Sequence, residues 1–181
     1  MTDNRIFSNH LPDVICLGEA LVDRLGPLGG DPEISEYTED CFGGAPANVA
    51  CGLAKLGVNV AFLGRLGADS IGANFRELMI DRGINLLGLQ IDSSRPTRIV
   101  LVRREKNGER LFQGFKGNCG EGFSDQFLEP DELSASWPLI ASQARWLLIG
   151  SLPLASPSSA EGLLWSLDKA RKAGIAIALD V

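Results

Sequence analysis

The sequence predicts an α/β fold built on a mostly parallel sheet, with a small antiparallel part. Continuous apolar runs indicate strands covered on both faces, and they lie at residues 14–17, 59–64, 146–150 and 175–179. Amphipathic helical patterns separate most of these runs, and such alternation implies parallel neighbours joined by crossovers. Asn107-Gly108 lies between two strand-like runs, 98–104 and 109–115, and predicts a hairpin that interrupts the alternation.

The composition indicates one soluble globular domain. The chain has 181 residues, of which 45% are hydrophobic and 22% charged. Its net charge of −6 and the absence of a basic cluster argue against a nucleic-acid or anionic-membrane partner. No apolar run reaches transmembrane length, so no membrane association is expected.

Cysteine and histidine usage argues against a metal site. No two cysteines have C-x-x-C spacing, and His10 is the sole histidine. Cys16 lies in an apolar run and Cys51 on a predicted helix, where both serve as small hydrophobic residues in a reducing, cytoplasmic compartment. Residues 1–12 are polar without an apolar core, and we expect a disordered leader rather than a signal peptide.

The first predicted strand, residues 14–17, is followed by Gly18 and two carboxylates, Glu19 and Asp23. Open α/β sheets bind ligands beyond the carboxyl ends of their strands. These carboxylates therefore either accept hydrogen bonds from a ligand or cap a turn. A turn-rich loop is predicted at 26–31.

The stretch 43–50 combines two glycines with the predicted start of a helix. Gly43 and Gly44 allow a backbone to approach a ligand closely. Pro46 suits the first turn of a helix. Asn48 then lies in that turn, with an amide that both donates and accepts hydrogen bonds. The arrangement suits binding of a polyhydroxylated small molecule, and the alternative is an ordinary strand-to-helix turn.

The predicted helix carries an apolar stripe and ends at a glycine. Val49, Leu53 and Leu56 recur at helical spacing, and Gly57 is placed to end the helix. The next Gly-rich loop, 64–72, matches neither G-x-G-x-x-G nor a Walker A sequence.

Further helices and strands follow this loop. Asp69 or Ser70 begins a second helix that ends near Gly83. The hairpin at 98–115 is either a lid over a ligand pocket or an ordinary edge hairpin. A third helix is expected from Pro130 to about Ala144.

Ser156-Pro157 opens the last helix, which ends at Gly174. Its apolar stripe is expected to be core rather than a cofactor site, and it consists of Ala160, Leu163, Leu164, Leu167 and Ala170.

The run 43–50, together with Gly57 and Gly67, resembles the N-terminal signature of the PfkB carbohydrate kinase family. Further similarity to the fructokinase-like branch covers about residue 13 to the last residue, and it includes 17–23, Pro96-Thr97-Arg98, Gly114-Phe115 and 179–181.

The resemblance implies a ribokinase-like, doubly wound, mostly parallel sheet with a small antiparallel lid at about 30–43 and 90–118. It implies transfer of the γ-phosphoryl group of ATP, with Mg²⁺, to a hydroxyl of fructose or a related ketohexose. It also implies a homodimer formed through the lid. The substrate-binding residues that it implies are Asp23, Gly43, Gly44, Asn48, Arg98, Phe112 and Phe115, with Asp180 on the nucleotide side.

The sequence departs from the family pattern in two places. Phe115-Lys116 stands where many relatives have Tyr-Arg, and lysine lacks the planar fork of arginine, so an acidic sugar is less favoured. The family's catalytic base lies on a Gly-Ala-Gly-Asp-type turn, which is not found here. We therefore expect the chain to carry the sugar-binding half and the lid, truncated before the base, and to be inactive in isolation.

Two alternatives stay open. One is a non-catalytic sugar-binding or regulatory protein of kinase ancestry, and the other is a ribose, nucleoside or ketodeoxygluconate kinase of the same family. In each case the last strand is apolar on both faces with no helix after it, which predicts an exposed apolar patch.

Overall fold

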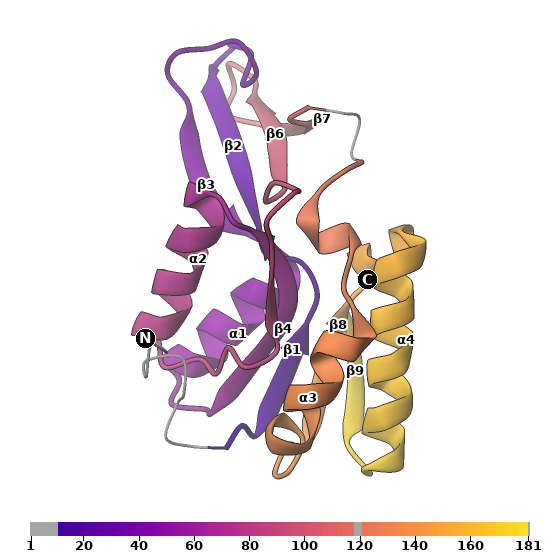
Figure 1. Cartoon of the computed structure of the whole chain (residues 1–181). Helices are drawn as coiled ribbons and strands as arrows, with labels where there is room; N and C mark the ends of the chain where they lie inside the picture. Colours follow the sequence, from indigo (N-terminus) through magenta and orange to yellow (C-terminus); the bar gives the residue numbers. More distant parts are fainter. Residues whose placement is uncertain (1–10, 118–120, 181) are drawn as a thin grey trace.

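The computed structural model describes residues 11–117 and 121–180. Most of the expected leader, residues 1–10, lies outside this range, as do Cys119 and Val181. The described chain forms two sheets, which we call the main sheet and the upper sheet (Figure 1).

The main sheet is parallel, with strand order β5-β4-β1-β8-β9. Its strands are β1 Val14–Leu17, β4 Val60–Gly67, β5 Leu89–Asp92, β8 Trp146–Gly150 and β9 Ala176–Asp180. The predicted α/β class is thus confirmed. Because the chain moves outward from β1 on both sides, β1 and β8 form the topological switch point of the sheet.

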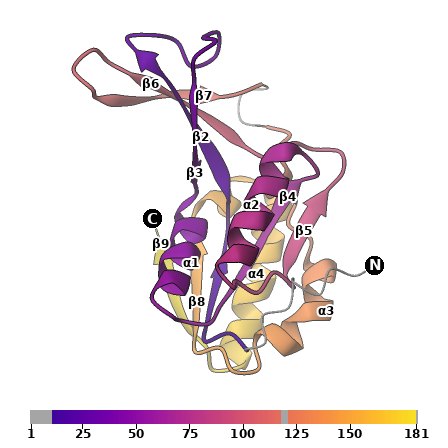
Figure 2. The same cartoon turned by 90° about the vertical axis from the view of Figure 1, so that its left-hand side faces the viewer.

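Helices cover both faces of the main sheet, as Figures 1 and 2 show. They are α1 Ala45–Lys55, α2 Ser70–Asp81, α3 Pro130–Ile140 and α4 Pro157–Lys172, with short 3₁₀ helices η2 Ser124–Gln126 and η3 Leu152–Ala155. Successive residues of β1 enter different cores: Cys16 packs on the α1–α2 side, and Ile15 and Leu17 on the α3–α4 side. No described helix is long and apolar enough to span a bilayer.

The apolar stripe predicted for α1 is only partly correct. Val49 and Leu56 are exposed, Leu56 by 81%, and the face toward the sheet consists of Pro46, Ala47, Ala50 and Cys51. Small residues are buried here because α1 packs closely over β1, β4 and β8. In α4, Leu163 and Ala170 are core as predicted, whereas Leu164 is exposed.

The upper sheet has strand order β3-β2-β6-β7 and is mixed. Its strands are β2 Leu21–Leu28, β3 Glu39–Gly43, β6 Ile99–Arg104 and β7 Arg110–Phe115. The hairpin at Asn107-Gly108 is confirmed by the antiparallel β6–β7 pair. The central β2–β6 pair is parallel, which the sequence did not indicate. The lid segment expected at about 90–118 begins too early. Its first residues belong to β5, which is a strand of the main sheet and not of the upper sheet.

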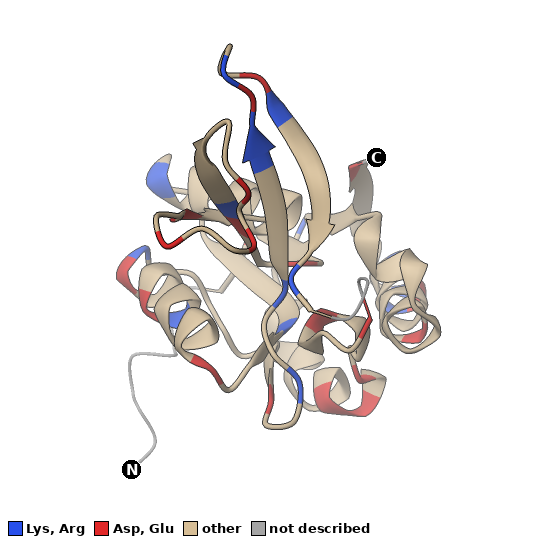
Figure 3. Cartoon of the chain, turned by 90° about the horizontal axis from the view of Figure 1, so that it is seen from above, with Lys and Arg blue, Asp and Glu red and all other residues tan. Residues whose placement is uncertain are grey.

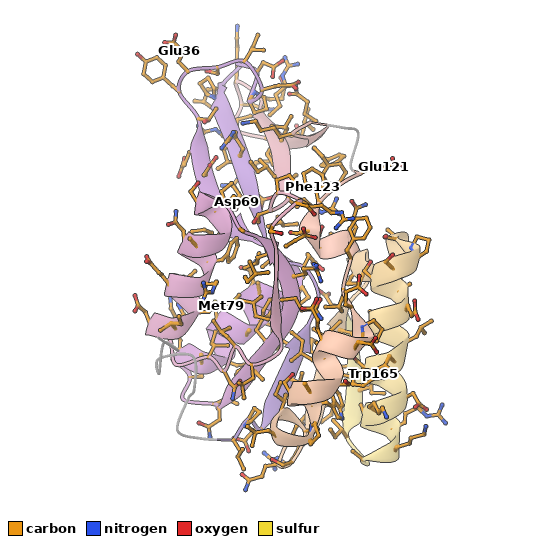
Figure 4. The ribbon with its side chains drawn as sticks, in the orientation of Figure 1. Glu36, Asp69, Met79, Glu121, Phe123 and Trp165 are labelled. Atoms are coloured by element: carbon orange, nitrogen blue, oxygen red, sulfur yellow. The ribbon has the colours of Figure 1, made fainter. Side chains whose placement is uncertain are left out.

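Asp69 and Thr97 connect the segment just before β6, which we call the root of β6, to the end of β4 in the main sheet. Figure 4 labels Asp69. Asp69 caps α2 by accepting from Gly72 N at 2.8 Å, as predicted. It also accepts from Thr97 N at 2.7 Å and from the Thr97 hydroxyl at 2.9 Å. A Cβ on Gly67 would lie 2.6 Å from Thr97 N, so glycine is needed for this close approach.

Candidate functional site

A single row of residues crosses all four strands of the upper sheet. Asp23 on β2 is paired with Cys41 on β3 and with Val100 on β6, and Val100 is paired with Phe115 on β7. Residues paired in this way project from the same face of a sheet. Asp23 was expected at or just past the end of β1. Its place is instead in the upper sheet, because the chain begins a new strand at Leu21.

The carboxylate of Asp23 lies against Gly43. The position that a Cβ would take on Gly43 is 2.8 Å from Oδ2 of Asp23. Within residues 11–117 and 121–180, no side chain or backbone group bonds to this carboxylate. Burial raises its pKa, and the nearby Arg110 opposes that rise. Asp23 therefore offers half-buried oxygens that are open to hydrogen-bond donors.

Gly44 and Asn48 lie at the start of α1. Gly44 is the N-cap with φ of 95°, a conformation that favours glycine, and its carbonyl accepts from Asn48 N at 2.9 Å. The Asn48 side chain is exposed and lines a hollow of about 180 Å³ between α1 and α2, together with Phe42 and Phe75. Asp23 does not line that hollow, so the two predicted side chains are not brought into one cavity.

Arg98 lies buried between two aromatic rings. Its Cζ is 4.9 Å from the ring centre of Phe115 and 4.7 Å from that of Phe123, which Figure 4 labels below the upper sheet. Its Nε and Nη2 donate to the two oxygens of Asp125 at 2.7 and 3.1 Å. Burial raises the pKa of Asp125, and the pair with Arg98 acts against this rise.

Two predicted residues line the same cavity. Arg98 and Phe115 line a cavity of about 450 Å³ whose other walls come from β7, the η2 region and the start of α4, including Gln126, Phe127, Leu152 and Ser156. Phe112 does not line it. Its ring is 66% exposed and meets Phe115 edge-on at 5.3 Å.

Carboxylates gather at the carboxyl ends of the main-sheet strands. Glu19 follows β1 and is buried, and Asp180 is the last residue of β9. Burial raises the pKa of Glu19, the backbone N–H groups of Glu19 and Ala45 oppose this rise by hydrogen bonding to the carboxylate, and the charges of Asp125 and Asp180 add to it. Figure 3 shows acidic and basic residues interspersed over the elements seen from this side.

Sequence reasoning missed Phe123 and Asp125 and left the role of Glu19 open. Phe123 and Asp125 lie in an irregular segment without motif or periodicity, so no local signal marked them. The signal for Glu19 was a carboxylate directly after a buried strand.

No group of three or more His, Cys, Asp or Glu side chains within 11–117 and 121–180 could hold an ion. The one predicted residue on the nucleotide side, Asp180, is exposed at the end of β9.

The fold is that of an α/β protein in which glycines and carboxylates lie where a parallel sheet meets a second, smaller sheet. The sequence matches the pfkB family carbohydrate kinase over residues 11–179. The chain therefore belongs to this family.

The chain is 32% identical over 164 residues to a fructokinase of Klebsiella pneumoniae, covering 91% of this chain and 48% of the relative. It is 31% identical over 175 residues to a 5-dehydro-2-deoxygluconokinase of Listeria monocytogenes, covering 93% of this chain and 50% of the relative. The crystal structure of a Xylella fastidiosa fructokinase with bound ATP is similar, with a TM-score of 0.78 and 29% identity, covering 94% and 52% of the two chains. The chain thus spans about half the length of these relatives. The structural similarity shows that its fold is ribokinase-like.

Proposed function

We propose that the chain provides the sugar-binding part of a fructokinase-like, ATP-dependent sugar kinase. The observation that carries the proposal is the Asp23 carboxylate, which lies over Gly43 with no bonding partner among the described residues. A carboxylate in this setting accepts hydrogen bonds from sugar hydroxyls, and charge-assisted bonds of this kind are strong.

In this proposal the other predicted residues also contact the sugar, although Asp23, Asn48 and Arg98 do not line a common cavity in this structure. Gly43 and Gly44 leave room for it beside the backbone, and the Asn48 amide contacts a hydroxyl. Arg98, Phe112 and Phe115 belong to the β6–β7 side, which acts as a lid that excludes water. The cavity lined by Arg98 and Phe115 supports this role because it opens under that hairpin.

We infer a neutral sugar rather than an acidic one. The guanidinium of Arg98 is the buried cation of the cavity, and Asp125 already engages two of its nitrogens. A sugar carboxylate would have to compete with this pair. The similarity to a 5-dehydro-2-deoxygluconokinase keeps an acidic sugar as the second candidate.

ATP and Mg²⁺ are proposed as cosubstrate and cofactor, with Asp180 on the nucleotide side. ATP would supply the phosphoryl group, and Mg²⁺ would neutralise charge on its phosphates. In this proposal the described residues bind and orient the sugar.

A dimer through the upper sheet is also proposed. Both outer strands of this sheet expose aromatic rings, with Phe42 on β3 and Phe112 on β7. Sedimentation velocity of the chain and of a Phe112→Lys variant tests it: a dimer should dissociate in the variant, and a monomeric parent chain would contradict it.

The experiment is isothermal titration of the chain with fructose, beside 5-dehydro-2-deoxygluconate and ribose. Fructose should bind most tightly, and Asp23→Asn should weaken binding by about tenfold. Asp40→Asn is the matched control, because Asp40 lies on the adjacent strand and pairs with Arg24 instead. Absence of sugar binding by the folded chain, or equal binding by Asp23→Asn, would refute the proposal. Phosphorylation assayed with ATP and Mg²⁺ tests its kinase part.

A further inference from the structure

Glu19 lies where four segments meet at glycines. Gly18 directly follows β1, and Gly44 precedes α1. Gly64 lies in β4, and Gly150 is the last residue of β8. A Cβ on Gly44 would be 2.5 Å from the Glu19 carbonyl oxygen, and one on Gly64 would be 2.6 Å from the Gly18 carbonyl oxygen. Only glycines permit these approaches, so the backbone forms a tight enclosure around Glu19.

The two carboxyl oxygens of Glu19 have different surroundings. Oε1 accepts from Ala45 N at 3.1 Å, which ties Glu19 to the first residue of α1. Oε2 is fully buried and has no hydrogen-bond partner among residues 11–117 and 121–180. The position of a Cβ on Gly150 lies 2.8 Å from this Oε2, and the Pro46 ring packs against the same position.

An ionised Oε2 would be unfavourable in this enclosure. A buried charge without a partner is costly, and the other charged groups that face Glu19 are the carboxylates Asp125 on η2 and Asp180 on β9. Asp125 is itself paired with Arg98. The residues that α1 and β8 place against Glu19, namely Ala45, Pro46 and Gly150, carry no titratable side chain.

We propose that Glu19, in its neutral acid form, is a positioning residue that holds the Gly44–Ala45 turn in the sugar-binding arrangement, and that its ionisation loosens this turn. This inference rests on the proposed sugar-binding function. Glu19 acts through the turn and does not touch the sugar, because Oε2 is sealed from solvent. Burial, which raises the pKa of Glu19, supports the neutral form.

The sign of the pH effect follows from this arrangement. A carboxyl group whose pKa is raised on folding stabilises the folded turn at low pH, and this contribution is lost as pH rises through the folded-state value. Sugar affinity should therefore fall as the pH is raised toward 8.

The experiment measures fructose affinity by calorimetry between pH 5.5 and 8 for the whole chain and three variants. Glu19→Gln is neutral and keeps an acceptor for Ala45 N, so it should bind as the parent does at low pH and lose the pH dependence. Glu19→Ala should bind at least about tenfold more weakly. Glu77→Gln, which changes an exposed glutamate of α2, is the matched control and should keep the parent's pH profile.

Hydrogen exchange of the α1 N-terminal amides, without sugar, separates this inference from the proposed function. The amide of Ala45 should exchange faster in Glu19→Ala but not in Glu19→Gln. If the parent binds no sugar, this measurement alone decides whether Glu19 holds the turn. If Glu19→Ala does not fold, Gly150→Ala takes its place, because its Cβ displaces Oε2.

Three results would overturn the inference. One is a pH profile of Glu19→Gln that parallels that of the parent. Another is a loss of affinity in Glu19→Gln as large as that in Glu19→Ala. The third is unchanged exchange at Ala45 in Glu19→Ala, or in Gly150→Ala where that variant is used.

Discussion

Asp23 on β2 and Gly43 on β3 are diagonal neighbours, since Gly43 is paired with Leu21 and Asp23 with Cys41, and a Cβ on Gly43 would lie 2.8 Å from Oδ2 of Asp23. Because Gly43 has no side chain, the Asp23 carboxylate can occupy the space next to it. In Gly43→Ala the carboxylate must rotate away, because real Cβ atoms do not approach an oxygen so closely.

We expect Gly43→Ala to weaken fructose binding by about tenfold, or ~1.4 kcal/mol, with the fold retained. Calorimetric titration measures this change. Gly52→Ala is the control, since its Cβ meets nothing within 4 Å and alanine in mid-helix adds about 0.5–1 kcal/mol of stability. Unchanged affinity in Gly43→Ala would exclude Asp23 as a sugar ligand in its observed position.

Asn48→Ala should affect binding without affecting stability. The side chain is exposed and bonds to no described residue, so the free energy of unfolding should change by less than about 0.5 kcal/mol. Loss of one hydrogen bond to a hydroxyl should cost about 0.5–1.5 kcal/mol of binding free energy. Val49→Ala, at the next exposed position, should bind fructose normally. Equal affinities in both variants would remove Asn48 from the site.

Arg98→Met should be strongly destabilising because it leaves Asp125 buried and unpaired. Breaking a buried ion pair costs about 3–5 kcal/mol, and urea unfolding at pH 7 measures it. The double variant Arg98→Met/Asp125→Leu should recover much of this loss. If Arg98→Met/Asp125→Leu is no more stable than Arg98→Met, the unpaired Asp125 is not the cause of the destabilisation.

The same variant has a defined pH dependence. Burial already raises the pKa of Asp125 while Arg98 opposes the rise, and removing Arg98 raises it further. A carboxyl group with a raised pKa is accommodated at low pH, and the stability is lost as pH rises through the folded value. Arg98→Met should therefore lose less stability at pH 5 than at pH 8, and a penalty independent of pH would contradict this.

Asp69→Ala should release the root of β6. It removes the cap of α2, which costs about 0.5–2 kcal/mol, and also both bonds to Thr97. Thr97→Val removes only the hydroxyl bonds and is the matched comparison. Hydrogen exchange at Thr97 should accelerate more in Asp69→Ala than in Thr97→Val. Equal exchange in the two variants would assign the restraint to the hydroxyl alone.

The open face of β9 should promote association. Ile177 and Leu179 are 37% and 53% exposed on this outermost strand, as the apolar pattern predicted. Ile177→Lys/Leu179→Lys should lower binding of an apolar dye and reduce association in light scattering. Val49→Lys adds a charge at an exposed position of α1, and it should leave dye binding and association unchanged. A parent chain that binds no dye would contradict the prediction.

The sequence predicted most elements because their signals are local. Apolar runs located β1, β4, β8 and β9, the Asn-Gly turn located β6 and β7, and Asp69 located the start of α2. The parallel β2–β6 pair could not be predicted, since pairing between distant segments leaves no periodicity in either one. The stripe on α1 was partly wrong because alanine and cysteine, not larger residues, fit the narrow space above the sheet.

The structure brings only some of the predicted site residues together. Gly43, Gly44 and Asp23 lie together, whereas Asn48 and Phe112 are exposed away from the cavity of Arg98 and Phe115. Asp125 neutralises Arg98 through a contact between segments 27 residues apart, which local patterns do not reveal.

The parallel pairing of β2 with β6 also orders the folding of the chain. These strands join only after the segment between them, which contains β3, α1, β4, α2 and β5, has been brought into a closed loop. Closing so long a loop costs entropy before the strand contacts compensate for it. We expect the β6–β7 hairpin to form locally and the upper sheet to be completed late, after the α1–α2 side of the main sheet has collapsed.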